Sequence, residues 1–225
     1  MNVKWSYLDL VRYKDAIDLM SRLREKVRNG DNEDYLLLLQ HYPVITRGNS
    51  EWGKEGGLKM PRREIERRGI EVVDSDRGGK TTYHGPGQLV GYMVMDLARR
   101  KLGPKVFVRT VLEIIQAMLD TYDIDAKIDD KRPGLYVDGE KIAFVGLNIK
   151  HNVTTHGFSL NVKNDLKESQ YFVPCGMNDI RLTTMEKVTG INHSVFDVYW
   201  RFVTFWADRI SDELWEIDRD ELLAK

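Results

Sequence analysis

The sequence lacks most of the features that mark specialised classes of protein. It contains one cysteine among 225 residues, which excludes an internal disulfide and fits a reducing compartment. Its formal net charge is -1, so it has none of the overall basic character of nucleic-acid-binding proteins. No apolar run is long enough to span a membrane, and Met1 to Leu10 contains no signal-peptide core. We therefore predict a cytoplasmic protein with no nucleic-acid and no membrane partner.

The composition that remains is that of a globular protein. Hydrophobic residues make up 42% and charged residues 31% of the chain, which argues against a disordered or fibrous protein. The sequence has no repeat, no low-complexity tract and no clear linker. We predict one domain over residues 1–225, of the α+β class, with a mixed β-sheet flanked by helices.

Apolar spacing predicts the elements of that domain. Residues three and four apart predict helices, and short apolar runs between turn signals predict strands. The predicted helices are 9–28, 61–68, 106–119 and 195–215, and the predicted strands outside the meander are 35–39, 70–73 and 89–97. Residues 124–162 are predicted as a β-meander with reversals at Asp138-Gly139 and His151-Asn152. Residues 46–60 and 163–180 are predicted to be irregular.

Two local basic clusters interrupt the near-neutral charge pattern. One contains Arg62, Arg63, Arg67 and Arg68, and the other contains Arg99, Arg100, Lys101 and Lys105. Such clusters are most often solvated helix faces. If one of them docks an acidic partner, we favour the first, because it precedes the glycine-rich segment described next.

A glycine-rich segment, Arg77–Gln88, is the longest stretch with the composition of a binding loop. Its four glycines allow the backbone to approach a ligand closely and leave N–H groups free to face it. Arg77 and His84 add polar side chains to the same wall. The segment matches neither the phosphate-binding P-loop nor the dinucleotide fingerprint. The alternative is a structural turn that needs several glycines.

The single cysteine, Cys175, lies between Pro174 and Gly176. A lone cysteine is more often a buried apolar residue than a reactive one. The flanking proline and glycine place this one in a loop, where a thiol is able to reach a substrate. The residues alone leave the two interpretations equally supported.

Lys141 and His156 are the other candidates. If residues 140–149 form one regular strand, Lys141 shares a face with Ala143, Val145 and the alternate residues beyond. At the margin of a core it would be partly desolvated, which lowers the pKa of a lysine and suits it to act as a base; the alternative is a solvated hairpin lysine. His156 alternates with Phe158 and is interpreted as a core histidine. The five histidines show no zinc-ligand spacing with the cysteine, so we predict no metal.

Taken in order, these segments resemble the lipoyl(octanoyl) transferase family. The similarity is close across 77–97, 139–146, 156–162 and 174–176, and weaker over most of the rest of the chain. The string from Arg77 to Gln88, followed downstream by Lys141-Ile142-Ala143 and by Pro174-Cys175-Gly176, is the most specific part of it. The fold that the resemblance implies is that of the biotin and lipoate protein ligase catalytic domains.

The resemblance also implies residue roles. Cys175 matches the nucleophile that accepts the acyl group, and Lys141 matches the lysine that lowers the pKa of that thiol and assists proton transfer. Three segments match the lining of the acyl-binding pocket. They are Arg77, Gly78, Gly79, Lys80, Thr81, Thr82, Tyr83 and His84; Phe144, Val145 and Gly146; and Gly157, Phe158 and Ser159.

The implied reaction is transfer of an octanoyl group from octanoyl-acyl carrier protein to a lysine, the first step of endogenous protein lipoylation. The acceptors would be lipoyl domains of 2-oxoacid dehydrogenase complexes or the glycine cleavage H protein. A thioester exchanges with a thiol at little free-energy change, so no cofactor and no ATP are expected. The resulting oxyanion would be stabilised by the backbone N–H of Gly176 or by the Gly78-Gly79 turn.

Two alternatives fit the same sequence. An ATP-dependent lipoate-protein ligase on the same fold would form an acyl-adenylate and would need no cysteine. A non-enzymatic module that binds acylated or lipoylated domains would never gain a covalent octanoyl group.

Overall fold

The computed structural model describes residues 1–51, 57–177, 179–210 and 212–224. Within them, a nine-stranded sheet runs in the order β12-β1-β2-β6-β10-β9-β8-β7, with β11 paired to β9. Its strands are β1 (Asn2–Val11), β2 (Asp34–His41), β6 (Gln88–Val94), β7 (Lys127–Ile128), β8 (Gly134–Val137), β9 (Glu140–Lys150), β10 (Val153–Asn161), β11 (Arg181–Leu182) and β12 (Glu213–Glu216). The sheet is mixed, since β1 runs parallel to both of its neighbours whereas β6, β10, β9 and β8 are antiparallel.

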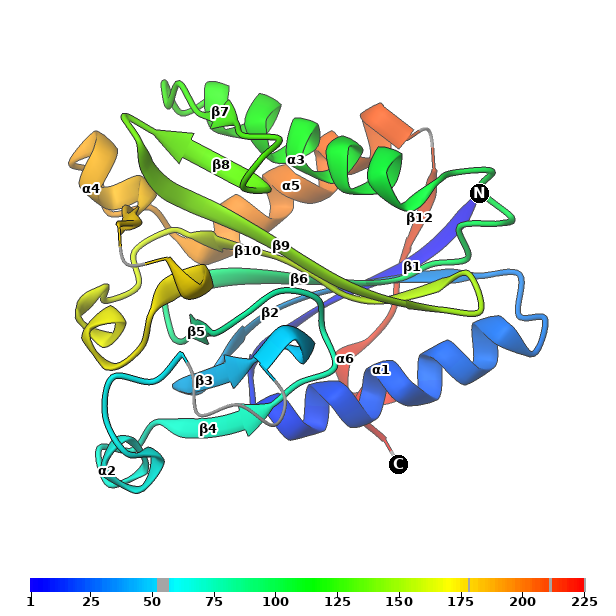
Figure 1. Ribbon diagram of the computed structural model, residues 1–225. Helices are drawn as coiled ribbons and strands as arrows, with labels where there is room; N and C mark the ends of the chain where they lie inside the picture. Colours follow the sequence, from blue (N-terminus) through cyan, green and yellow to red (C-terminus); the bar gives the residue numbers. More distant parts are fainter. Residues whose placement is uncertain (52–56, 178, 211, 225) are drawn as a thin grey trace.

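Helices cover both faces of this sheet (Figure 1). The helices are α1 (Tyr13–Arg28), α2 (Arg62–Glu66), α3 (Pro104–Asp120), α4 (Met185–Thr189), α5 (Val195–Ile210) and α6 (Arg219–Leu223). α3 and α5 pack on one face around Phe107, Phe202 and Trp206. α1 packs on the other face through Ala16, Met20 and other residues of its apolar stripe. The α+β class and the mixed sheet flanked by helices are therefore confirmed.

A second sheet of three short strands lies beside α1 (Figure 1). It is formed by β4 (Glu71–Asp74), β3 (Val44–Arg47) and β5 (Thr82–His84), in that order. The described residues also form the 3₁₀ turns η1 (Asn49–Glu51), η2 (Lys167–Tyr171) and η3 (Pro174–Gly176). No helix in the described ranges is long and apolar enough to cross a membrane.

The meander was predicted correctly, including both of its tight reversals. Asp138 and Gly139 have φ values of 50° and 79°, and His151 and Asn152 have values of 52° and 65°. Consecutive positive φ values are those of the type I′ turn, whose twist matches that of the strands it joins. The meander brings β9 and β10 together in the middle of the sheet, where the candidate residues lie.

The predictions at both ends of the chain were partly wrong. The helix predicted from residue 9 begins at Tyr13, because the preceding residues form β1, whose alternation is broken by a bulge between Tyr7 and Leu10 with Asp9 at φ 57°. The helix predicted to residue 215 ends at Ile210, because Trp215 belongs to β12 and pairs with Lys4. In the segment predicted to be irregular, 46–60, residues 46 and 47 belong to β3; residues 52–56 lie outside the described part.

Candidate active site

All predicted site residues except Tyr83 line one cavity of about 590 Å³ on the meander. This volume lies in the range of small-molecule sites. The cavity is bounded by the glycine-rich segment, by β9 and β10, by the loop before β8 and by the turn that carries Cys175. From the predicted set its lining includes Arg77, Gly78, Gly79, Lys80, Thr81, Thr82, His84, Lys141, Phe144, Val145, Gly146, Gly157, Phe158, Ser159 and Cys175.

The glycine-rich segment reaches this cavity by attaching to β9. The pairing of β8 with β9 ends at Gly134 and Phe144, so the β9 backbone beyond Phe144 is not paired with β8. The N–H of Gly78 donates to the carbonyl of Leu147 at 3.0 Å. A Cβ at position 78 would lie 2.9 Å from that oxygen, so this approach needs a residue without a side chain.

Arg77 anchors the same segment to β3 through Thr46. Its side chain is 7% exposed, and its guanidinium donates to the side chain and carbonyl of Thr46 and to the carbonyl of Gly78. In the described ranges no carboxylate lies within ion-pair distance of it. Burial lowers the pKa of Arg77 below its ordinary value, but an arginine keeps its proton in proteins. The loop is therefore held by a buried positive charge.

The nucleophile candidate lies at the centre of a strained turn. Cys175 has φ 54° and ψ 15°, a left-handed conformation that non-glycine residues seldom adopt and that costs about 1–3 kcal/mol. Its N–H donates to the carbonyl of Thr81 at 3.1 Å, which ties the turn to the glycine-rich segment. The thiol is partly exposed, so Cys175 belongs to a loop that faces the cavity and is not a core residue.

Lys141 lies next to that thiol. Its Nζ is 3.7 Å from Cys175 Sγ and donates to the carbonyl of Pro133 at 3.0 Å. The same atom lies 4.9 Å from the ring centroid of Phe144 and 5.3 Å from that of Tyr136, within the range of cation–π attraction. The side chain is 3% exposed, so Lys141 is not the solvated hairpin lysine of the alternative interpretation.

The face predicted for Lys141 was wrong. Regular alternation would place it with Ala143 and Val145, but the register of β8 against β9 shifts between Leu135 and Tyr136, so Ile142 is the additional residue of a β-bulge. The bulge turns Lys141 towards Phe144 and Cys175. Gly134 provides the space, because a Cβ there would lie 2.4 Å from Lys141 Cε.

Burial gives this lysine an altered acidity. Desolvation lowers the pKa of Lys141 below its ordinary value, and the charge and hydrogen bond of Cys175 act in the opposite direction. A desolvated ammonium loses its proton more readily than one in water. A thiol and a lysine in contact, both beside a largely apolar cavity, form an arrangement that is able to exchange protons during acyl transfer.

His156 lies deeper in the cavity wall and bonds to a single carboxylate. Its Nε2 is 2.8 Å from Asp76 Oδ1, and Asp76 also accepts hydrogen bonds from Asn148 and Lys150. The His156 hydrogen bond is the largest cause that lowers the pKa of Asp76. Burial lowers the pKa of His156, so the ring is neutral and donates from Nε2. His156 is buried, as predicted for a core histidine, but it also lines the cavity. Its pairing with Asp76 fixes the start of the glycine-rich segment against β9 and β10.

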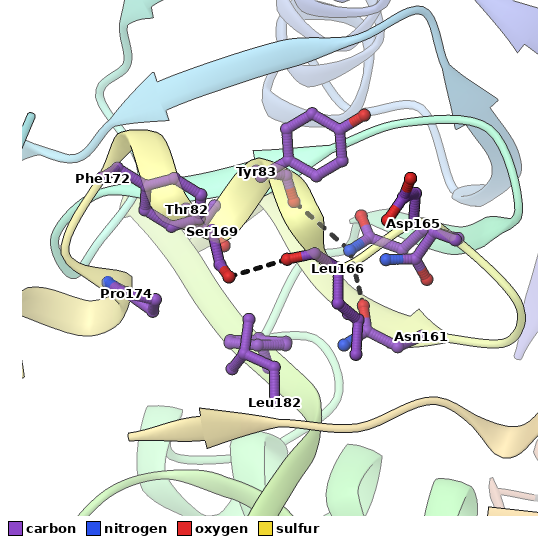
Figure 2. A pocket seen from close by; sticks show the side chains of 12 residues that line it. Thr82, Tyr83, Asn161, Asp165, Leu166, Ser169, Phe172, Pro174 and Leu182 are labelled. Carbon is purple, nitrogen blue, oxygen red and sulfur yellow. Dashed lines mark hydrogen bonds between the residues drawn. The ribbon is translucent and has the colours of Figure 1, made fainter. Parts of the chain in front are cut away.

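A second, small pocket, drawn in Figure 2, is lined by residues that include Pro174, the neighbour of Cys175. Thr82, Phe144 and Pro174 belong to its lining, together with Tyr83, which lines this pocket and not the larger cavity. Its volume of about 10 Å³ corresponds to roughly one water molecule.

A chain of amides runs along this second pocket. Gln88 Oε1 lies 2.7 Å from His84 Nδ1, and Gln88 Nε2 donates to the carbonyl of Tyr83 and to Asn161. Asn161 in turn donates to the carbonyl of Thr183. Because Nε2 of Gln88 is the amide donor, Oε1 accepts and His84 Nδ1 carries the proton. This chain fixes His84 and β5 beside the turn of Cys175.

His41, which is bonded to the cavity-lining residue Tyr92, leads to a prediction about pH. His41 is fully buried; its Nδ1 donates to the carbonyl of Val11, and its Nε2 accepts from the hydroxyl of Tyr92. Burial lowers the pKa of His41 to about 4. In the unfolded chain a histidine titrates near 6.5, so below that pH the unfolded state binds more protons than the folded state.

The contribution of His41 to the free energy of unfolding should therefore be present in full well above pH 6.5, and it should be lost as the pH falls towards 4. We expect His41 alone to remove about 2 kcal/mol from the free energy of unfolding between pH 7 and pH 5. Urea unfolding at the two pH values measures this loss. In His41→Gln the loss should be smaller by about that amount, whereas His151→Gln, on an exposed turn, should match the parent. An equal loss in the parent and in His41→Gln would contradict the assignment.

Neither basic cluster lies in the cavity. Arg99 and Arg100 are bonded to Asp34, and Arg100 is also bonded to Asp212, so these two arginines hold the sheet edge together. The prediction of a solvated helix face is therefore wrong for Arg99 and Arg100. In the other cluster, Arg62 pairs with Glu66 and Arg68 lies over the ring of Tyr171 in η2.

Comparison with known proteins extends these observations. Residues 12–206 match the family model described as the lipoyl protein ligase A/B catalytic domain. The octanoyltransferase of Caldicellulosiruptor saccharolyticus is 36% identical over 99% of this chain and 94% of its own length. That of Legionella pneumophila strain Lens is 41% identical over 76% of this chain and 83% of its own.

Solved structures show the same fold at lower identity. A lipoate-protein ligase A bound with ATP superposes with a TM-score of 0.78 at 15% identity, covering 99% of this chain and 93% of that one. A putative lipoate protein ligase from T. acidophilum with bound lipoic acid has a TM-score of 0.72 at 16% identity, covering 100% and 93%. This similarity concerns the fold alone.

Proposed function

The chain belongs to the lipoyl protein ligase A/B catalytic domain family, and on that premise we propose that it is an octanoyltransferase that works through a thioester on Cys175. The observation that carries the proposal is the 3.7 Å contact between Cys175 Sγ and Lys141 Nζ beside the 590 Å³ cavity. The names of the relatives at 36–41% identity support octanoyl transfer within protein lipoylation.

The first half-reaction forms the acyl-enzyme. The Cys175 thiolate, paired with the Lys141 ammonium, attacks the carbonyl carbon of an octanoyl thioester, and the carbonyl π electrons move to oxygen. When the tetrahedral species collapses, the C–S bond to the donor breaks, and the departing thiolate takes a proton from Lys141. The products are the free donor thiol, an octanoyl thioester on Cys175 and a neutral Lys141 amine. The depressed pKa of Lys141 favours this proton loss.

The second half-reaction restores the pair. The neutral amine of an acceptor lysine attacks the Cys175 thioester, and Lys141 takes the proton that this nitrogen must lose. Collapse then breaks the bond to Sγ and forms an amide. Cys175 leaves as a thiolate beside a protonated Lys141. We propose octanoyl-acyl carrier protein as the donor, a lipoyl domain as the acceptor and the cytoplasm as the compartment, in keeping with the relatives' function.

The cavity suits such a substrate. Phe144, Val145, Leu147 and Phe158 supply apolar surface for an eight-carbon chain, and burial of each methylene contributes about 0.8 kcal/mol. Gly146 and Gly157 pair with each other across β9 and β10, so this part of the lining carries no side chains that would fill the cavity. An octanoyl chain in the cavity would leave its thioester beside Cys175.

Intact mass spectrometry tests the proposal. After incubation with octanoyl-acyl carrier protein and no acceptor, the protein should gain the mass of one octanoyl group, and the label should transfer to an added lipoyl domain. An ATP-dependent ligase would instead release AMP from ATP in the presence of free octanoate and would gain no octanoyl mass from the carrier. Absence of the acyl-enzyme together with AMP release would overturn the proposal in favour of the ligase. Absence of both would favour a binding module.

A further inference from the structure

We propose that Lys80 is a further catalytic residue of this reaction, whose ammonium group stabilises the oxyanion that forms on the acyl carbonyl in both half-reactions. The inference rests on the proposed function, because it needs an acyl group on Cys175. It begins from the backbone of the nucleophile turn. Acyl transfer commonly uses free backbone N–H groups beside the nucleophile for this purpose, so their availability here decides where the stabilising charge must come from.

The turn itself has no such donors to offer. The N–H of Cys175 donates to the carbonyl of Thr81, that of Gly176 to Val173 and that of Met177 to Pro174, at 3.0–3.1 Å. On the facing segment, the N–H of Gly78 is bonded to Leu147. Of the backbone donors proposed from the sequence, the N–H groups of Gly176 and Gly78 are therefore engaged, which leaves only that of Gly79 in the Gly78-Gly79 turn. Removing any of these bonds would open the turn that presents the thiol.

The Lys80 side chain occupies the position that the backbone leaves open. It lies directly against Gly176: a Cβ built at position 176 would be 2.3 Å from Lys80 Cδ and 2.8 Å from Lys80 Nζ. The absence of a side chain at Gly176 allows this approach, and Gly176 also has φ 64°, which favours glycine. The ammonium therefore lies beside the residue that follows the nucleophile.

A backbone hydrogen bond places residues 80 and 81 beside the nucleophile turn. The carbonyl of Thr81, the next residue, accepts from the N–H of Cys175, so residues 80 and 81 run alongside residues 175 and 176. Lys80 lines the same cavity as Cys175 and Lys141. No carboxylate in the described part of the chain forms an ion pair with Lys80, so its charge is available to a substrate. Lys141, by contrast, donates to the carbonyl of Pro133 and faces the thiol.

The two lysines thus divide the chemistry. Lys141 exchanges protons with the leaving thiol and the attacking amine, whereas Lys80 offers a positive charge to the oxygen. Stabilisation of the oxyanion lowers the barrier of both acylation and deacylation, because each passes through a tetrahedral species. A charge that only attracted an acidic carrier protein would act on association and would be screened by salt.

The test uses Lys80→Met, Lys80→Arg and, as a control for loss of one surface charge, Lys163→Met; Lys163 is outside the cavity and bonded to Asn192. The donor is octanoyl-N-acetylcysteamine, an uncharged small thioester that cannot engage a docking patch. Single-turnover acylation and the later transfer to a lipoyl domain are followed separately. We expect Lys80→Met to slow both steps by about 10², with KM for the donor little changed, and Lys80→Arg to restore much of the loss.

The pH profile of Cys175 alkylation distinguishes this role from that of Lys141, since it should be the same in Lys80→Met as in the parent. Wild-type rates of acylation in Lys80→Met, or an equal loss in Lys163→Met, would overturn the inference. So would a loss confined to acyl carrier protein as donor, which would indicate docking. If the wild-type protein itself gained no octanoyl mass, the proposed function would fail first and independently.

Discussion

Cys175→Ser is expected to abolish octanoyl transfer, with a rate reduced by about a thousandfold or more. The substitution replaces a thiol, whose thiolate is a strong nucleophile, with a hydroxyl that is a far weaker nucleophile. Serine differs from cysteine only in having an oxygen atom in place of sulfur, so it fits the same turn. Lys141 is also unsuited to ionise a hydroxyl. An alcohol holds its proton far more tightly than a thiol does, and burial makes Lys141 a weaker base by lowering its pKa.

The measurement has two parts. Intact mass should show no stable octanoyl adduct on Cys175→Ser after exposure to octanoyl-acyl carrier protein, and a gel assay should show no octanoylated lipoyl domain. Thermal unfolding should be close to that of the parent, because Cys175 is only partly buried. Transfer by the serine variant at a rate near wild type would rule out the covalent mechanism and leave direct transfer from donor to acceptor.

The glycine-rich segment and the loop position of Cys175 could be predicted because their signals are local. Glycine and proline determine backbone conformation where they stand, so a loop at 77–81 and a turn at 174–176 follow from the residues. The turn at Asp138-Gly139 followed for the same reason, and at His151-Asn152 the asparagine tolerates the left-handed conformation. Amphipathic spacing likewise identified α1 and α3, because each buries one continuous stripe.

The remaining features depend on contacts between distant residues. β12 exists because Glu213–Glu216 pairs with the first strand of the chain, and nothing near residue 213 encodes that partner. The orientation of Lys141 depends on a bulge that a register shift against β8 creates. The contact between Lys141 and Cys175 joins residues 34 positions apart. The position of Lys80 in space also depends on a contact between distant residues, the hydrogen bond between Thr81 and Cys175.

Lys141→Met is expected to reduce transfer by about 10²–10⁴, the range associated with loss of a general acid–base group. Methionine has nearly the same length and keeps the apolar contacts with Tyr136 and Phe144, so the cavity wall is preserved while the charge is removed. Without the ammonium, the departing donor thiolate has no proton source and the attacking amine has no acceptor. Both half-reactions should therefore slow, in contrast to a variant that affects only donor binding.

The removal of the cation should also change the reactivity of Cys175 itself. A positive charge 3.7 Å from Sγ favours thiolate, so the pH at half-maximal alkylation by iodoacetamide should move upward in Lys141→Met. Lys187→Met is the matched control, because Lys187 pairs with Glu140, the neighbour of Lys141 in β9, at the surface. It should leave both the alkylation profile and turnover unchanged. If Lys141→Met kept the parent's profile and turnover, the contact between the two side chains would be structural, and the proton transfers would need another group.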